Sequence, residues 1–316
     1  MGEPLQEIAI GNRSLHANVI TYGASLTDLR LTGKDTPLVL GYADPSIYPF
    51  DQQFMGSVIG RYGNRIADGR FCLNDQEICL EQNETGIGHL HGGSNGLWNR
   101  HWEVAKRTAT KAVLEVKSDN GDGGYPGTLI LSASYEIVEP ATLRLTFLAA
   151  CDRDTIINIC HHPYFNFSGT HPTEQHMLQI NADCYLPSSK SLLPTGSVAR
   201  VEGTSFDFRK ERLLGKVDRN NTFCLHRKSS GELLKAARLS CADISMELWT
   251  TQPGIHLYNG YKLSRKHTGH LGSPYPPRSG ICLEAQAWPN SPNEPAFPNT
   301  VLRADTTYRQ VTEYRF

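Results

Sequence analysis

The segments LILSASYEIV (129–138) and TLRLTFLAA (142–150) are separated by only three residues, and hydrophobic and polar side chains alternate along both. Side chains of a β-strand point alternately to opposite faces, so a period of two indicates a strand with one face in a core. The spacing therefore predicts two neighbouring strands. Their expected inward-facing residues are Leu131, Ala133, Tyr135 and Ile137 in the first segment, and Leu143, Leu145 and Phe147 in the second.

The same alternation recurs on both sides of this pair. KAVLEVKSD (111–119), ASLTDLRLTG (24–33) and GIHLYNGYKL (254–263) are also short strand candidates. Gly- and Pro-rich gaps, such as DNGDGGYPG (119–127) and SGTHP (168–172), are typical of tight turns. Many short strands with frequent turns predict an all-β fold, a large antiparallel β-sandwich or barrel, and we expect one domain over residues 1–316.

Helical patterns are rare in this sequence. ERLLGKV (211–217) and ELLKAARL (232–239) are the two segments that favour short helices. The second segment could equally begin a strand after the turn formed by SSGE.

Composition excludes several classes of partner. The 316 residues include 31 Lys and Arg against 32 Asp and Glu, which leaves no basic field for nucleic acid and no polybasic membrane patch. No apolar run approaches the roughly 18 residues of a membrane span. The N-terminal MGEPLQEIAIGNRS lacks the pattern of a secretory signal. The eight cysteines include no CxxC pair, so we expect free thiols and a cytoplasmic protein.

Two polar clusters precede the central strands. GRYGNRIADGRF (60–71) places Asn64 and Arg65 among glycines; its arginines are either solvated turn residues or donors for an oxygen-rich ligand. GHLHGG (88–93) puts His89 and His91 two positions apart, hence on one face of a strand. Such a pair fits structural histidines, a catalytic or sugar-contacting histidine, or a metal site.

Two further clusters follow the central strands. In HHPYFNFSG (161–169) the adjacent His161 and His162 point opposite ways on an extended segment, so one could enter a pocket while the other packs. In SGICLEAQAWPNSPNEPAFP (279–298) Glu284 interrupts an apolar strand. A carboxylate is costly to bury unless it is paired or functional, and burial raises its pKa toward the range of a general base.

Taken together, these stretches resemble the aldose 1-epimerase (galactose mutarotase) family over nearly the whole chain. The stretches that carry the resemblance are ITYGASLTDLRL (20–31), IGRYGNRIADGRF (59–71), LHGG (90–93), NICHHPYFNFSG (158–169), TTQPGIHLYNG (250–260), ICLEAQAWPN (281–290) and EPAFP (294–298). The resemblance implies a large twisted antiparallel β-sandwich with a sugar cleft on its concave face. It implies a small-molecule sugar as substrate, with no metal or organic cofactor.

The resemblance also assigns roles to residues. It places Glu284 as the base on the anomeric hydroxyl and His162, protonated, as the acid toward the ring oxygen, because opening a hemiacetal requires both. His91 would join them in catalysis and, with Arg65 and its neighbour Asn64, hold sugar oxygens. Aromatic side chains that could offer an apolar face to the sugar, or simply pack in the core, are Trp249, Trp288 and Tyr258.

The chain departs from the family pattern at two positions. A sugar-contacting aspartate of the family falls in VDRNNTFCL (217–225), where an ungapped count gives Asn220 and an insertion would give Asp218. His256 stands where the family often has glutamine. A lost carboxylate and a cationic ring would make the cleft less negative, so an anionic sugar (sulfo, phospho or uronic) is an alternative to a neutral hexose or pentose.

Other functions remain open on the sequence. A non-catalytic sugar-binding module needs the same cleft without the acid–base pair. A metal-dependent isomerase or hydrolase would use His89, His91, His161 and His162. A glycosidase needs two carboxylates across the scissile bond, and we find one good candidate. The sequence is compatible with a monomer or a homodimer.

Overall fold

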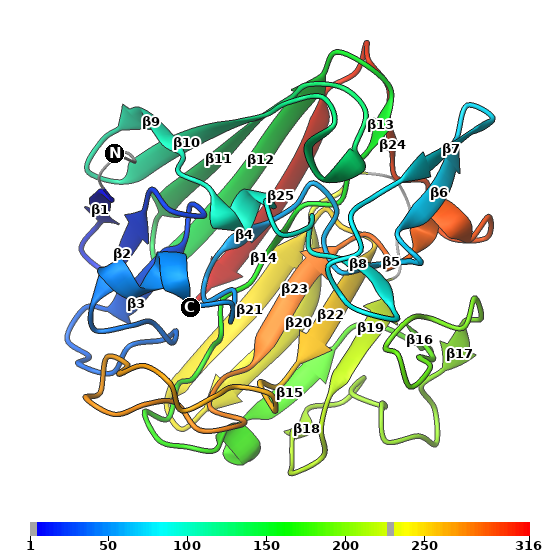
Figure 1. Ribbon diagram of the computed structural model, residues 1–316. Helices are drawn as coiled ribbons and strands as arrows, with labels where there is room; N and C mark the ends of the chain where they lie inside the picture. Colours follow the sequence, from blue (N-terminus) through cyan, green and yellow to red (C-terminus); the bar gives the residue numbers. More distant parts are fainter. Residues whose placement is uncertain (1–4, 226–230) are drawn as a thin grey trace.

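The computed structural model describes residues 5–225 and 231–316, which form layers of antiparallel β-sheet (Figure 1). Within these residues the largest sheet has nine strands. In spatial order they are β18 (Arg212–Leu213), β15 (Met177–Ile180), β20 (Leu234–Cys241), β21 (Ile244–Thr250), β25 (Tyr308–Arg315), β12 (Thr142–Cys151), β11 (Leu129–Val138), β10 (Lys111–Ser118) and β9 (Glu103–Arg107).

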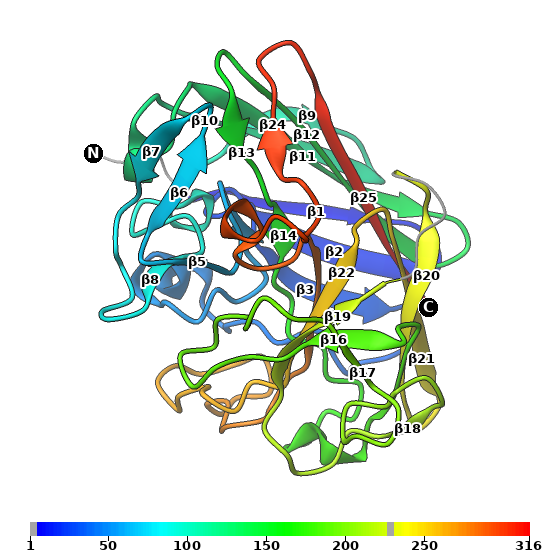
Figure 2. The ribbon, with the colours of Figure 1, turned by 90° about the vertical axis from the view of Figure 1, so that its right-hand side faces the viewer.

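A second sheet, with five strands among the described residues, forms another layer. Figure 2 shows β20, β21 and β25 on one side and β16, β19 and β22 beside them in this second layer. Its strands in order are β17 (Ala199–Arg200), β16 (Cys184–Leu186), β19 (Asn220–Cys224), β22 (Gly254–Tyr258) and β23 (Cys282–Gln286).

Smaller elements complete the layers. The N-terminal strands β1 (Glu7–Gly11), β2 (Leu15–Ile20) and β3 (Leu26–Leu31) form their own sheet. Two-stranded pairs are β4 (Val58–Ile59) with β14 (Cys160–His161), β5 (Arg65–Ala67) with β8 (Gly88–Leu90), β6 (Arg70–Leu73) with β7 (Gln76–Cys79), and β13 (Thr155–Ile156) with β24 (Val301–Leu302). The short 3-10 helices are η1 (Pro45–Phe50), η2 (Leu97–Asn99), η3 (Asp122–Gly124), η4 (Thr173–Gln175) and η5 (Ser291–Asn293).

The strands predicted from the alternating pattern are confirmed. Strands β11 and β12 pair antiparallel, with Tyr135 opposite Leu145 and Ala133 opposite Phe147. All the residues expected to face inward on these two strands are buried in one apolar cluster. Residues of β2, β3, β22 and β23 belong to the same cluster, so one continuous core joins the three larger sheets. The all-β sandwich expected from the sequence is therefore what the chain forms.

Neither segment forms a helix, and for ELLKAARL the alternative of a strand is confirmed. ELLKAARL contributes most of strand β20, which pairs with β21 on one side and β15 on the other. ERLLGKV contributes only the short edge strand β18. Helix propensity is a weak preference, and here the pairing and burial of Leu239 and its neighbours within the sheet override it.

Strand β23 positions the functional residues through the same alternation. Leu283 and Ala285 point into the core, so Glu284 between them points to the opposite face of the five-stranded sheet. Register places His256 of β22 directly opposite Glu284, and Thr222 of β19 opposite His256. This polar face, turned away from the core, forms the floor of a pocket.

Two further predictions concern the cysteines and membrane-spanning segments. All eight cysteines are free thiols, as the sequence predicted. None of the helices in the described residues is long and apolar enough to cross a membrane.

The assignment of faces in β12 can be tested with two leucines on one strand. Leu145 is fully buried, whereas Leu148 is 42% exposed on the other face. Leu145→Ala is expected to lower the free energy of unfolding by about 3 kcal/mol, because it leaves a cavity. Leu148→Ala is expected to change it by less than about 0.5 kcal/mol. Urea unfolding of both variants measures this, and equal losses would contradict the assignment.

Candidate active site

A pocket of about 230 Å³ lies on the polar face of the five-stranded sheet. Its floor comes from β19, β22 and β23, and its walls come from segments that cross over them, including β5 and the ends of β8 and β14. The pocket is smaller than sites for drug-sized ligands and suits a single sugar ring. It brings together the sequence-predicted residues His162, Glu284, His91, Asn64, Arg65, Asn220 and His256.

The two residues proposed for proton transfer lie side by side. His162 Nε2 is 3.6 Å from Glu284 Oε1, and both side chains are almost fully buried. A thiol lies behind each group: Cys160 Sγ is 3.6 Å from Glu284 Oε2, and Cys282 Sγ is 3.5 Å from His162 Nδ1. His162 follows directly after β14 and Glu284 lies in the middle of β23, so these two elements bring the imidazole and the carboxyl group together.

Burial decides the charge of this pair. Desolvation raises the pKa of Glu284 to about 8, although the Cys160 thiol and the positive charge of Arg65 oppose the rise. Desolvation also lowers the pKa of His162 to about 4. Near neutral pH burial therefore favours the neutral form of both groups, with the carboxyl group protonated and the imidazole uncharged. These directions run against the protonated His162 that the resemblance implies.

The position of His91 depends on an unusual, left-handed backbone conformation and on a hydrogen bond to its ring. The residue has a φ of 54°, and the backbone N–H of Asn64 donates to its Nδ1 at 3.2 Å. Burial holds the pKa of His91 well below its usual range, so the neutral ring carries its proton on Nε2. At the following Gly92, a Cβ atom would lie 1.8 Å from the carbonyl oxygen of Gly60. Gly92 of LHGG thus allows this close backbone packing.

In the pocket, Arg65 forms an ion pair with Glu84. Its Nε donates to Glu84 Oε2 at 2.6 Å, and its Nη2 donates to Glu84 Oε1 at 2.8 Å. Both residues line the pocket. Asn64, which has a φ of 63°, accepts a hydrogen bond at Oδ1 from the backbone N–H of Arg65. A two-pronged contact of this kind fixes the plane of the guanidinium group.

His256 and Asn220 form one hydrogen-bonded unit on the floor. The Thr222 hydroxyl and the Asn220 Oδ1 each lie 2.8 Å from a ring nitrogen of His256. Because the amide oxygen can only accept, His256 donates from Nε2 and accepts from Thr222 at Nδ1. Burial lowers the pKa of His256 to about 3, so the ring is neutral. The premise of a cationic His256, on which the anionic-sugar alternative partly rested, does not hold.

Two predicted sugar contacts lie elsewhere. Trp249 is on β21, where its indole donates to Glu247 and stacks under the guanidinium group of Arg315 at 4.0 Å. Asp218 is exposed and pairs with Arg278. Neither lines the pocket, whereas Asn220 does, which agrees with the ungapped count. Tyr258 lines the pocket as well, but Trp288 does not.

The two other histidines of the HxH and HH pairs also point away. His89 contacts the hydroxyl of Tyr125 and the carbonyl of Glu81, and His161 packs against Tyr135 and Tyr314. The four imidazoles therefore do not converge on one point. In the part of the chain that the structure describes, no group of three His, Cys, Asp or Glu side chains is arranged to hold a metal ion.

Phe54 and Glu84 are among the wall residues to which no motif in the sequence pointed. Phe54 packs over both site histidines, with ring centroids 4.7 Å from His91 and 5.9 Å from His162. Glu84 is the partner of Arg65 described above. Both lie in irregular segments where no periodicity marks a side chain as inward-facing. The isolated aromatic residue before SVIGRYGNR was the only available signal, and it is a weak one.

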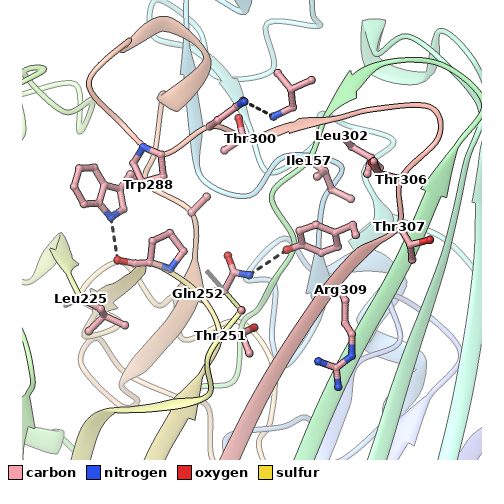
Figure 3. Close-up of a pocket in the computed structure, with 17 residues that line it drawn as sticks. Ile157, Leu225, Thr251, Gln252, Trp288, Thr300, Leu302, Thr306, Thr307 and Arg309 are labelled. Atoms are coloured by element: carbon pink, nitrogen blue, oxygen red, sulfur yellow. Dashed lines mark hydrogen bonds between the residues drawn. The ribbon is translucent and has the colours of Figure 1, made fainter. Parts of the chain in front are cut away.

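A larger pocket, of about 680 Å³, lies between the β22–β23 sheet and the segment around β24 and β25 (Figure 3). Trp288 Nε1 donates to the carbonyl of Pro253 there, and Gln252 contacts the hydroxyl of Tyr308. None of its described lining residues is a histidine or a carboxylic acid. Size favours the larger pocket, whereas the convergence of titratable groups makes the smaller one the candidate active site.

A layered β-sandwich with a buried carboxyl–imidazole pair in a sugar-sized pocket defines a class of sugar-converting enzyme that needs only proton transfer. The family model described as aldose 1-epimerase matches residues 6–315. The chain belongs to the aldose 1-epimerase family, and it is an isomerase of the epimerase type.

Relatives support this assignment along the full length of the chain. It is 35% identical to the galactose mutarotase of Homo sapiens over 100% of this chain and 95% of the relative, and 31% identical to the aldose 1-epimerase of Escherichia coli (strain K12) over 100% and 96%. A crystal structure of a GalM/aldose epimerase homologue from C. elegans superposes with a TM-score of 0.93 at 27% identity, covering 99% of this chain and 98% of the other. The galactose 1-epimerase of Lactobacillus acidophilus NCFM gives 0.86 at 27% identity, with coverage of 99% and 94%.

The protonation of the pocket histidines can be measured directly. Because burial lowers the pKa values of His162 and His256 to about 4 and about 3, both rings should stay neutral at about pH 5.5, where an unperturbed imidazole is mostly charged. Imidazole NMR shifts of the empty protein, assigned with His162→Asn and His256→Gln, provide the measurement. A cationic ring at that pH would contradict the burial argument.

Proposed function

We propose that the protein interconverts the α and β anomers of a free, uncharged aldose, with Glu284 and His162 exchanging the protons. The observation that carries this proposal is their 3.6 Å contact at the floor of a sugar-sized pocket. Relatives named galactose mutarotase make galactose the first substrate to test.

The reaction requires two coupled proton transfers. The anomeric hydroxyl loses a proton to Glu284 while the ring oxygen gains one from His162, and the bond between C1 and the ring oxygen breaks. An open-chain aldehyde results. After rotation about the C1–C2 bond, the hydroxyl attacks either face of the aldehyde, and both protons return. One base and one acid on the same small ligand suffice for this chemistry.

The protonation state that burial favours for Glu284 and His162 matches the state required for ring closure. After ring opening, Glu284 holds the proton and His162 is neutral. This is the protonation state that burial favours in the empty pocket. Ring closure can thus start from the resting state. Ring opening first needs the proton to move from the carboxyl group to the imidazole, and the positive charge of Arg65 favours that transfer by stabilising the carboxylate.

The remaining residues orient the sugar in this proposal. His91 Nε2–H and the free guanidinium donors of Arg65 hold sugar oxygens and stabilise the negative charge that develops on them. Asn220 and His256, locked together on the floor, contact hydroxyls on the far side of the ring. Phe54 and Tyr258 present apolar surface to the C–H groups of the sugar.

We also propose a cytoplasmic enzyme that works as a monomer or a homodimer. The free state of all eight thiols supports a reducing compartment.

Substitution separates catalysis from mere sugar binding. Glu284→Gln and His162→Asn should each lower kcat for galactose mutarotation by about 10²–10⁴-fold, with bound sugar still detectable, because each removes a proton-transfer group. Polarimetry of freshly dissolved α-galactose gives the rate. His161→Asn, a change of the neighbouring histidine outside the pocket, is the control, with folding checked by circular dichroism. A Glu284→Gln variant with full activity would show that Glu284 is not the base, whereas a wild type that binds sugar without epimerising it would support a binding module.

The rate should show a bell-shaped dependence on pH. Activity requires one proton on the pair. The rate should fall above about pH 8, where Glu284 loses that proton. It should also fall below about pH 4, where His162 becomes protonated and the pair carries two protons. The log of kcat/KM against pH reports both limits for the free enzyme, provided folding is checked at each pH. Other titratable or charged groups near the pair are Arg65, Glu84, Lys262, His91, His256, Cys160, Cys282, Tyr164 and Tyr258. A flat profile would contradict this assignment.

A further inference from the structure

We propose that Glu84 is a specificity-determining residue, which restricts the pocket to uncharged aldoses by offsetting the charge of Arg65. This inference rests on the function proposed above and extends it to the charge of the substrate.

The contact between the two side chains is close and partly dry. Two parallel hydrogen bonds of 2.6 and 2.8 Å join the guanidinium of Arg65 to the carboxylate of Glu84. The side chain of Arg65 is 7% exposed and that of Glu84 is 22% exposed. Solvent and salt screen such a pair much less than a surface ion pair.

The backbone holds Glu84 in place. The residue starts a tight turn that leads into β8: its N–H donates to the carbonyl of Gly88 at 3.1 Å, and its own carbonyl accepts from the N–H groups of Ile87 and Gly88. These bonds fix the backbone of Glu84, and the two hydrogen bonds from Arg65 hold its carboxylate at the pocket wall.

Among the described lining residues, the other ionisable groups contribute little charge. Burial keeps His91, His162 and His256 neutral and leaves a proton on Glu284. Lys262 is exposed at the rim, where water screens its charge. Arg65 thus carries the positive charge of the buried wall, and the negative charge of Glu84 offsets it. The resulting pocket is close to neutral.

A near-neutral pocket selects against charged sugars. An uncharged sugar can donate hydroxyl hydrogen bonds to Glu84 and accept others from Arg65 without disturbing the pair. A sugar with a carboxylate or phosphate group would meet the Glu84 carboxylate, and it would have to displace that carboxylate to reach Arg65. Repulsion of the wrong substrate therefore supplies specificity.

The test compares galactose with galacturonate, which differ only in the carboxylate at C6, at about pH 7. Wild type should epimerise galactose with a kcat/KM at least about tenfold above that for galacturonate, because two like charges a few ångströms apart repel strongly in a partly dry site. Equal values for wild type would overturn the proposal without any variant.

The same sugars are then compared in Glu84→Gln, which keeps the shape of the side chain and removes its charge. The ratio of kcat/KM for galacturonate to that for galactose should rise about tenfold or more. Glu77→Gln is the matched control, because Glu77 also pairs with an arginine, Arg70, but on the exposed β6–β7 hairpin. Its ratio should equal that of wild type.

The pH profile gives a readout that a purely structural role would not move. Removing a negative charge from the wall leaves Arg65 unopposed and stabilises the Glu284 carboxylate, so the alkaline limit of kcat/KM should shift to lower pH in Glu84→Gln and stay unchanged in Glu77→Gln. If galactose is epimerised normally by wild type while neither the sugar ratio nor this limit changes in Glu84→Gln, the specificity role is overturned and the proposed function stands. If wild type epimerises neither sugar, the proposed function itself fails.

Discussion

The alternation of side chains along β23 links the stability of this protein to its chemistry. Leu283 and Ala285 point into the core that joins the sheets, and Glu284 between them therefore points into the pocket. Pairing with β22 sets His256 opposite Glu284 in the same row. A slip of one residue in this register would exchange the two faces and would bury the carboxyl group in the core. The packing that stabilises the sandwich thus also orients the Glu284 carboxyl group into the pocket.

Exclusion of water then sets the electrostatics of the pocket. A carboxyl group and an imidazole that share a desolvated site are each driven toward their neutral forms, which leaves one proton for the pair. The same effect keeps His91 and His256 uncharged and turns them into fixed hydrogen-bond partners. The ion pair of Arg65 with Glu84 completes this near-neutral wall. Such an environment suits proton transfer to and from an uncharged sugar. The only ions formed in the proposed reaction are the Glu284 carboxylate and the His162 imidazolium.

Resemblance to the aldose 1-epimerase family pointed to most of the predicted residues that line the pocket, and some of them also interrupt regular patterns. Glu284 stands out in an apolar strand, and two histidines precede a rigid aromatic segment. Trp249 was a wrong expectation: its ring covers the outer side of β21 and meets Arg315. Glu84 and Phe54 escaped notice, since a polar turn residue and an isolated aromatic side chain occur throughout any surface. Only the path of the chain across the sheet brings them to Arg65 and His162.

The sequence by itself determined strands β10, β11 and β12 of the largest sheet and the all-β class, and its resemblance to a known family pointed to the candidate acid–base pair. Periodicity and local composition are properties of neighbouring residues, so they survive without coordinates. The tertiary structure alone showed that Glu284 and His162 are desolvated side by side and that Arg65 is paired with Glu84. Each of these depends on burial and on contacts between residues distant in the chain, such as the 3.6 Å approach of residues 162 and 284. A desolvation free energy cannot be read from sequence, because it depends on which atoms replace water around the group.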